Sequence, residues 1–157
     1  QDITFLSDIV DRLLDLRMYY DEYRPILLKV SPDLSHEQLD EIIDYCLRSG
    51  IDGIVAGNTT RSREGLTSIS KEKIEEIGNG GMSGAPVHKK NLELVRYVHT
   101  KSDGKLPIIG VGGIMSPEQA KDMLDAGASL VEIYSGFIYE GPSLVKRILK
   151  YLEQIGK

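Results

Sequence analysis

Residues 107–114 read PIIGVGGI, a short apolar run that ends in a pair of glycines. Three further short runs rich in branched apolar residues lie at 26–30, 53–56 and 129–133. Because nearly every residue in these runs is apolar, they predict the strands of a parallel sheet that is covered on both faces. Amphipathic segments separate the runs, as is typical of helices that cross over between parallel strands. The pattern therefore predicts an α/β fold.

The segments around these strands carry signals that start and end helices. Ser35, with Gln38 three residues later, predicts a capping box, and Gly50 favours the left-handed conformation that closes a helix. Ser116 and Pro117 predict the start of a second helix. Periodicity and turn signals predict further helices at 5–23, at 70–77, after His88 and after Gly141.

The resulting order is a helix without its own strand, followed by about four β/α units. This is half of the repeat that closes a (β/α)8 TIM barrel. We therefore expect residues 1–157 to form one half of such a barrel, because the edge strands of an open sheet need cover. A complete four-stranded α/β domain is the alternative. The connection 58–84 is long for a βα loop, which favours a functional role.

Composition narrows the classes of partner. The formal net charge is −5, so the chain lacks the surplus of Lys and Arg that nucleic-acid binding needs. Apolar runs fall short of the roughly 18 residues that span a membrane, and the first residues do not resemble a signal peptide, which predicts a cytoplasmic protein. His36, His88 and His99 lack metal-ligand spacing and predict no metal site, only surface or capping positions. Cys46 shares a helical face with apolar residues, which predicts a structural role.

In a β/α barrel the active site lies at the carboxyl ends of the strands, so the residues found there are the candidates for chemistry. Lys29 lies in the first strand, where an unpaired charge is costly to bury. Lys29 is therefore expected to point toward an anion or a developing negative charge. The alternative is that its side chain extends from the strand end so that the ammonium group reaches solvent. Asn58, Thr59 and Thr60 follow the second strand. They suit recognition of a small polar ring, or they only cap a turn.

Glycine-rich loops follow the other strands or precede a helix. These are GGMSG at 80–84, the pair Gly112 and Gly113, and YSG at 134–136. Glycine lets a backbone come close to a ligand, and its N–H groups can form an anion-binding nest. Phosphate sites in such barrels often lie after strands seven and eight. The last two loops, taken together, therefore predict a phosphate site.

The motifs in this order resemble class 2, quinone-linked dihydroorotate dehydrogenase, over nearly the whole chain. They are KVSPDL at 29–34, NTT at 58–60, GGMSG at 80–84, LPIIGVGGI at 106–114 and IYSGF at 133–137. A generic phosphate-binding barrel would share only the last two. The resemblance implies that residues 1–157 are the C-terminal half of an FMN-binding barrel, whose N-terminal half is a partner outside this chain.

The resemblance also implies roles for single residues. Lys29 is similar to the lysine that contacts the FMN ring, and Asn58 and Thr59 are similar to the pair that hydrogen-bonds the dihydroorotate ring. The positions similar to the FMN-binding residues, the last three around the phosphate, are Gly84, Gly113, Tyr134 and Ser135. The family often has Thr at the position of Gly57, so a backbone contact to FMN is expected there.

The reaction implied is the oxidation of dihydroorotate to orotate in pyrimidine biosynthesis, with FMN as hydride acceptor and quinone as final acceptor. The family's base is a serine in the earlier half of the barrel. No catalytic base is therefore expected in this chain, and Ser31 is not assigned that role. The isolated fragment is expected to be inactive, and the resemblance implies peripheral association with a membrane. The alternatives are another flavin- or phosphate-binding β/α barrel enzyme and a non-catalytic half-barrel scaffold.

Overall fold

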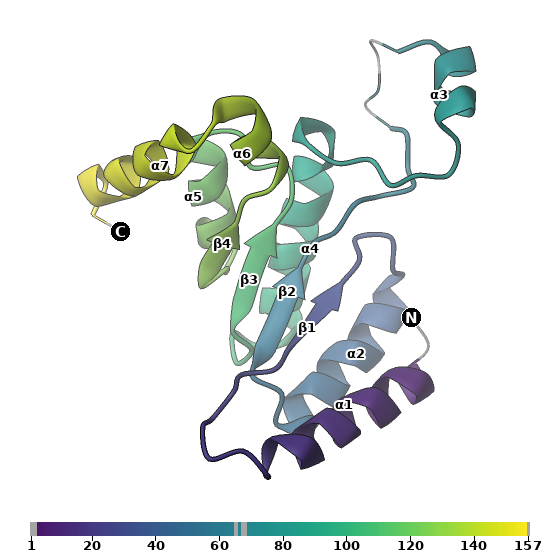
Figure 1. The fold of residues 1–157 in the computed structure, drawn as a ribbon, viewed down its shortest axis with the longest axis vertical. Coiled ribbons are helices and arrows are strands. Elements are labelled where there is room, and N and C mark those ends of the chain that lie inside the picture. Colours follow the sequence, from purple (N-terminus) through teal and green to yellow (C-terminus); the bar gives the residue numbers. More distant parts are fainter. Residues whose placement is uncertain (1–2, 65, 67–68, 157) are drawn as a thin grey trace.

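A computed structural model describes residues 3–64, 66 and 69–156. One sheet holds four parallel strands, which pair in the order of the sequence (Figure 1). The strands are β1 (Leu27–Val30), β2 (Gly53–Ala56), β3 (Ile108–Val111) and β4 (Leu130–Glu132). All four predicted strands are thus confirmed. Three agree with the predicted runs to within a residue at each end, and in the run 107–114 the strand ends at Val111, before the glycine pair.

Helices connect and flank these strands. They are α1 (Ile3–Arg17), α2 (His36–Ser49), α3 (Lys71–Ile77), α4 (His88–Lys101), α5 (Pro117–Asp125), α6 (Ser135–Glu140) and α7 (Ser143–Gln154), with a short 3-10 helix η1 (Ala85–Val87) before α4. The predicted capping box is present, since Gln38 N donates to Ser35 Oγ and Ser35 N donates to Gln38 Oε1. Helices α6 and η1 were not expected, because α6 begins inside the predicted YSG loop and η1 directly follows the GGMSG segment.

Helix α1 ends earlier than the apolar periodicity predicts. It stops at Arg17, whereas the pattern suggested a helix to Tyr23. Both residues donate to the carboxylate of Asp52, Arg17 to Oδ2 and Tyr23 to Oδ1. Six residues of helix would set them about 9 Å apart along the axis, so the chain must leave the helix for both to reach one carboxylate.

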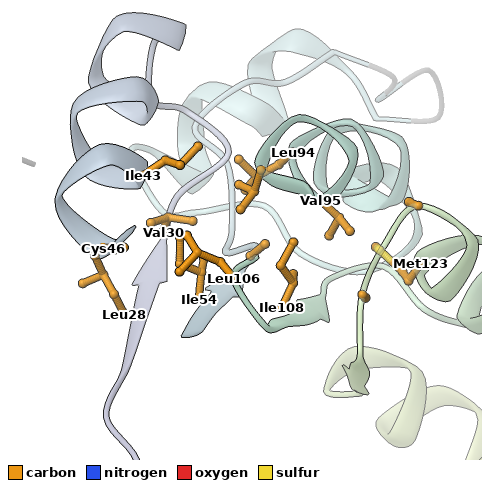
Figure 2. Packing of buried hydrophobic residues seen from close by; sticks show 14 of the residues in the cluster. Leu28, Val30, Ile43, Cys46, Ile54, Leu94, Val95, Leu106, Ile108 and Met123 are labelled. Carbon is orange, nitrogen blue, oxygen red and sulfur yellow. The ribbon is translucent and has the colours of Figure 1, made fainter. Parts of the chain in front are cut away.

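The core lies between the sheet and the helices α2, α4 and α5 (Figure 2). Strand residues that point toward the helices are Leu28, Val30, Ile54 and Ile108, and they meet Ile43 and Cys46 of α2, Leu94 and Val95 of α4, and Met123 of α5. Cys46 is 1% exposed, and burial raises the pKa of its thiol to about 11. This confirms the structural role predicted for Cys46, because a reactive thiol needs exposure and a low pKa.

The opposite face of the sheet is not covered by any helix in the described part of the chain. Lys29, Val55, Ile109 and Leu130 lie in register across the four strands on this face, and Leu130 is 62% exposed. The expectation that both faces are covered is therefore wrong for this chain. The physical reason is that the crossover helices pack on one side, as in the wall of a barrel, where facing strands cover the inner side.

Within the described residues, no helix combines the length and the apolar character needed to cross a membrane.

Candidate functional site

The carboxyl ends of the four strands surround a cavity of about 200 Å³. Parallel strands all end at the same edge of the sheet, so residues far apart in the sequence meet there. Every predicted contact residue except Gly57 lines the cavity: Lys29, Asn58, Thr59, Gly84, Gly113, Tyr134 and Ser135. The structure therefore brings the predicted FMN-binding and substrate-binding positions together, while their individual roles stay predictions.

Gly57 lies just behind the cavity, against strand β3. Its φ is +132°, in a region that side chains rarely adopt, and a Cβ built there would lie 1.9 Å from the carbonyl oxygen of Val111. Only glycine fits this conformation, because the backbones of two neighbouring strands approach closely. The glycine thereby sets the direction in which the chain leaves β2 toward Asn58.

The long connection after β2 returns to the strand ends through two contacts. Thr60 and Met82 form an isolated antiparallel bridge, in which Met82 N donates to Thr60 O at 2.8 Å and Thr60 N donates to Met82 O at 3.1 Å. Gly81 packs closely on Thr59, since a Cβ at residue 81 would lie 2.1 Å from Thr59 Oγ1. The GGMSG segment at 80–84 is thus brought beside the residues that follow β2. Helix α3 lies farther out on this connection, away from the sheet (Figure 1).

A cluster of charged and polar side chains holds this region on its outer side. Asp33, which follows β1, accepts hydrogen bonds from Lys90 Nζ at 2.5 Å, from Thr60 Oγ1 and from Arg61 N at 2.8 Å. Partial burial works to raise the pKa of Asp33, but the bonds from Lys90, Thr60 and Arg61 outweigh it and lower the pKa to about 2. The cluster ties the loops after β1 and β2 to α4. The sequence patterns did not single out Asp33 or Lys90 for this contact.

Asn91 is a second residue that the sequence patterns did not reveal. Its side chain is fully buried in α4 and pairs with the backbone of Asn58, donating from Nδ2 to Asn58 O and accepting at Oδ1 from Asn58 N. A signal was present in the sequence, because Asn91 shares one helical face with Leu94, Val95 and Val98. A polar residue on an otherwise apolar face indicates a buried group that has a partner.

The glycine pair after β3 packs on the start of α4. Gly112 and Gly113 have φ of +115° and +72°, and a Cβ at Gly113 would lie 2.5 Å from the backbone nitrogen of His88. This packing also explains why His88 differs from the exposed His36 and His99. Its side chain is only 12% exposed, and burial lowers the pKa of its imidazole. Of the two positions predicted for the histidines, surface is therefore wrong for His88 and capping is confirmed, since His88 is the C-cap of η1 and begins α4.

The donors around this end of the sheet suit a phosphate group. Helix α6 begins at Ser135, and Gly136 touches the β3 loop, since a Cβ there would lie 2.0 Å from Ile114 O. Gly113 lies outside the helices and strands, and its N–H donates no backbone hydrogen bond among the described residues. Ser135 and Gly136 occupy the first turn of α6, where N–H groups have no acceptor within the helix. Free N–H groups at a helix start and beside a glycine pair are typical of phosphate sites.

The rest of the lining suits a polar ring next to that phosphate. Lys29 contributes a positive charge, Asn58 and Thr59 contribute amide and hydroxyl groups, and Glu132 contributes a carboxylate. Ser83 also lines the cavity and accepts from Ser135 Oγ at 3.3 Å. These residues fit a nucleotide such as FMN, because they combine phosphate donors with polar groups for a ring. Within the described residues, no three His, Cys, Asp or Glu side chains gather as potential metal ligands.

A half-barrel whose glycine-rich strand ends form such a cavity belongs to the class of phosphate-binding β/α barrels. Comparison with known proteins narrows this class. Residues 6–155 match the model of the dihydroorotate dehydrogenase family, and the chain therefore belongs to that family.

Individual relatives agree with this assignment. The chain is 47% identical over 148 residues to a dihydroorotate dehydrogenase (quinone) of Christiangramia forsetii, covering 94% of this chain and 42% of the relative. It is 42% identical over 147 residues to the enzyme of the same name from Proteus mirabilis, covering 94% and 43%. The chain thus spans a little over two fifths of the length of these two relatives.

A solved structure confirms the fold prediction. The chain superimposes on ligand-free dihydroorotate dehydrogenase from Eimeria tenella with a TM-score of 0.86 and 29% sequence identity. The match covers 99% of this chain and 47% of that protein. The four parallel strands with their helices therefore correspond to part of the TIM barrel of this family.

Proposed function

We propose that this chain, together with the rest of its barrel, oxidises dihydroorotate to orotate with FMN as hydride acceptor and a quinone as final acceptor. The observation that carries this proposal is the cavity at the strand ends, which unites Lys29, Asn58, Thr59 and the glycine loops. The family membership supports the substrate and the place in pyrimidine biosynthesis. The assignment of a quinone as the final electron acceptor is supported by the name of the relatives, dihydroorotate dehydrogenase (quinone).

In this proposal the glycine loops hold the cofactor. Gly113, Tyr134 and Ser135 would bind the phosphate of FMN, with backbone N–H groups as the main donors. Gly84 would lie against the remainder of the cofactor through its backbone. Gly57 does not line the cavity, so the backbone contact to FMN expected there gives way to a role in directing the chain toward Asn58. When bound, FMN supplies a ring that accepts a hydride. The residues of this chain would then hold that ring and place a positive charge beside it.

Three side chains would act on the reacting groups. Asn58 and Thr59 orient the substrate ring, because an amide can donate to and accept from an amide-like edge. Lys29 places a positive charge where negative charge develops as hydride arrives. The base that removes the substrate proton would be a serine in the other half of the barrel. Ser31 suits that role poorly, since its Oγ already accepts from Asp33 N at 3.2 Å.

The open face of the sheet supports the domain assignment that we propose. We assign residues 1–157 to the C-terminal half of the barrel, and the N-terminal half would cover Leu130 and the apolar residues of α7 such as Leu149, both 62% exposed. Burial of such residues is strongly favourable, at about 25 cal/mol per Å² of apolar surface. We further place the complete enzyme in the cytoplasm at a membrane surface, where a quinone is available.

Native mass spectrometry tests the proposal most directly. The expected result is a complex of about twice the 17.4 kDa mass of this chain, carrying FMN and oxidising dihydroorotate when a quinone is added. A lone species of this mass without flavin, together with no quinone-dependent oxidation in the complete protein, would contradict the proposal. That outcome would favour a half-barrel that serves only as a scaffold.

A further inference from the structure

Asn91 is the most deeply buried polar side chain near the site, with no exposed surface. It lies on α4, on the side of the helix that faces strands β2 and β3. A fully buried amide is unfavourable unless its donors and acceptors are paired. Asn91 meets this need through Asn58, with Nδ2 donating to Asn58 O at 3.2 Å and Oδ1 accepting from Asn58 N at 3.3 Å.

The partner of Asn91 is informative, because it is the peptide backbone of a residue whose side chain lines the cavity. Two hydrogen bonds to the N–H and C=O of one residue restrict both the position and the rotation of its backbone. The direction of the Asn58 side chain follows from that backbone. Asn91 therefore acts on the cavity from behind, without lining it.

The same amide also contacts the glycine loop after β3. A Cβ at Gly112 would lie 2.2 Å from Asn91 Nδ2, and a Cβ at Gly57 would lie 3.0 Å from Asn91 Oδ1. Both glycines thus leave space that the Asn91 amide occupies. One buried side chain consequently touches the end of β2, which leads to Asn58, and the end of β3, which leads to Gly113.

We propose that Asn91 is a positioning residue that sets Asn58 at a defined place relative to the Gly112–Gly113 loop. This inference rests on the proposed function, in which Asn58 binds the substrate ring and the glycine loop holds the cofactor. The amide keeps the two ligands in register, because it bonds to one loop and packs against the other. Its loss therefore weakens binding of the substrate or product ring through Asn58.

The test uses the complete enzyme loaded with FMN and four proteins: wild type, Asn91→Asp, Asn58→Ala and the double variant. Aspartate keeps the shape and one acceptor of Asn91, but it replaces the donor to Asn58 O with a second acceptor. Orotate is titrated into each protein, and the change in flavin absorbance gives its Kd. In the otherwise wild-type protein, Asn91→Asp is expected to raise this Kd about tenfold, because the displaced Asn58 side chain loses about one hydrogen bond to the ring of orotate.

The double variant separates positioning from general damage to the fold. Without the Asn58 side chain there is no substrate contact to misplace, so Asn91→Asp is expected to change the orotate Kd less than about twofold in the Asn58→Ala background. Equal losses in both backgrounds, or no loss in the otherwise wild-type protein, would overturn the inference. If Asn91→Asp fails to fold, the same cycle with the smaller polar variant Asn91→Ser decides the question.

One further variant completes the design, and the wild type tests the proposed function. Tyr97→Phe on the same helix removes the hydrogen bond from Tyr97 to Asp40 Oδ1 of 2.6 Å, away from the strand ends, and is expected to leave the orotate Kd unchanged. Wild-type protein that neither binds orotate nor oxidises dihydroorotate would contradict the proposed function itself. Wild-type protein that does both, combined with independent effects at Asn91 and Asn58, would contradict only the positioning role.

Discussion

The two ends of the parallel sheet are built from the same strands but use their polar groups differently. At the amino ends, the Asp52 carboxylate accepts from Arg17 at 2.7 Å and from Ile26 N at 2.6 Å, and also from Tyr23. At the carboxyl ends, Asn58 and Thr59 present their side chains to a cavity. At the amino ends the polar side chains form hydrogen bonds within the protein, whereas at the carboxyl ends polar side chains line a cavity where a ligand can bind.

This difference shows how a β/α barrel divides stability and function between its ends. Partial burial works to raise the pKa of Asp52, but Tyr23, Ile26 N and Arg17 outweigh it and hold the pKa below its ordinary value. That carboxylate therefore stabilises the fold in its charged form. At the other end, supporting contacts such as Asn91 with Asn58 lie behind the site, so the groups in front remain available.

The largest expected effect would come from Lys29 at the carboxyl end. Lys29→Ala in the complete enzyme is expected to slow flavin reduction by about 100-fold or more, the size found when one charge-stabilising donor is removed from an active site. Its effect on the free energy of unfolding should be no more than about 1 kcal/mol, the value typical of single substitutions, because its charge is directed at the ligand cavity. Stopped-flow measurement of flavin reduction and urea denaturation would check both parts.

The matched control for Lys29 is Lys105→Ala, which changes an exposed lysine before β3, at the amino end of the sheet. Its reduction rate is expected to equal that of the wild type. Near-normal flavin reduction in Lys29→Ala would remove the charge-stabilising role that we give to Lys29.

At the amino end, a smaller effect is expected, which lowers the stability of the fold and leaves catalysis unchanged. Asp52→Ala leaves Arg17 and the N–H of Ile26 without their acceptor, so the free energy of unfolding should fall by about 2 kcal/mol. The KM for dihydroorotate should not change. Urea denaturation and steady-state kinetics would measure the two quantities, with the exposed Asp8→Ala as control. A raised KM without loss of stability would show that the two ends are not separate in function.

The smallest expected effect concerns pH and the Asp33 cluster, which is a satisfied network beside the functional end. The pKa of Asp33 is lowered to about 2 in the folded state from an ordinary value of 3.8. A lowered folded pKa means that the stabilisation is present above about pH 4 and is lost as the pH falls through about 2. Because the carboxylate is partly exposed and screened, we expect only about 1 kcal/mol.

Asp33→Asn tests this expectation, because it removes the charge and keeps the shape. Urea denaturation should find the variant less stable than the wild type at about pH 6, and the difference should shrink as the pH falls from about 4 toward 2. A difference that does not depend on pH would mean that Lys90 does not stabilise the charged form of Asp33.

The sequence by itself determined the elements and the candidates for the site. Runs of branched apolar residues predicted the four strands, and the residues Ser35 and Ser116 predicted helix starts, because strands and caps depend mainly on neighbouring residues. The motifs at the strand ends predicted the positions that line the cavity. Parallel strands place their carboxyl ends at one edge, so the order of the motifs was enough to bring these positions together.

The tertiary structure alone decided how the site is supported and which face of the sheet is covered. Asn91 and Asn58 are 33 residues apart, and Lys90 and Asp33 are 57 residues apart. The apolar helical face around Asn91 indicates that Asn91 is buried and paired, but no local pattern identifies the partner of Asn91 or of Lys90. Each partner depends on the strand register and on the rotation of α4 against the sheet. The early end of α1 also depends on a long-range contact. Arg17 and Tyr23 both donate to the carboxylate of Asp52, which directly precedes β2. Long-range geometry, which no short stretch of sequence encodes, sets these features.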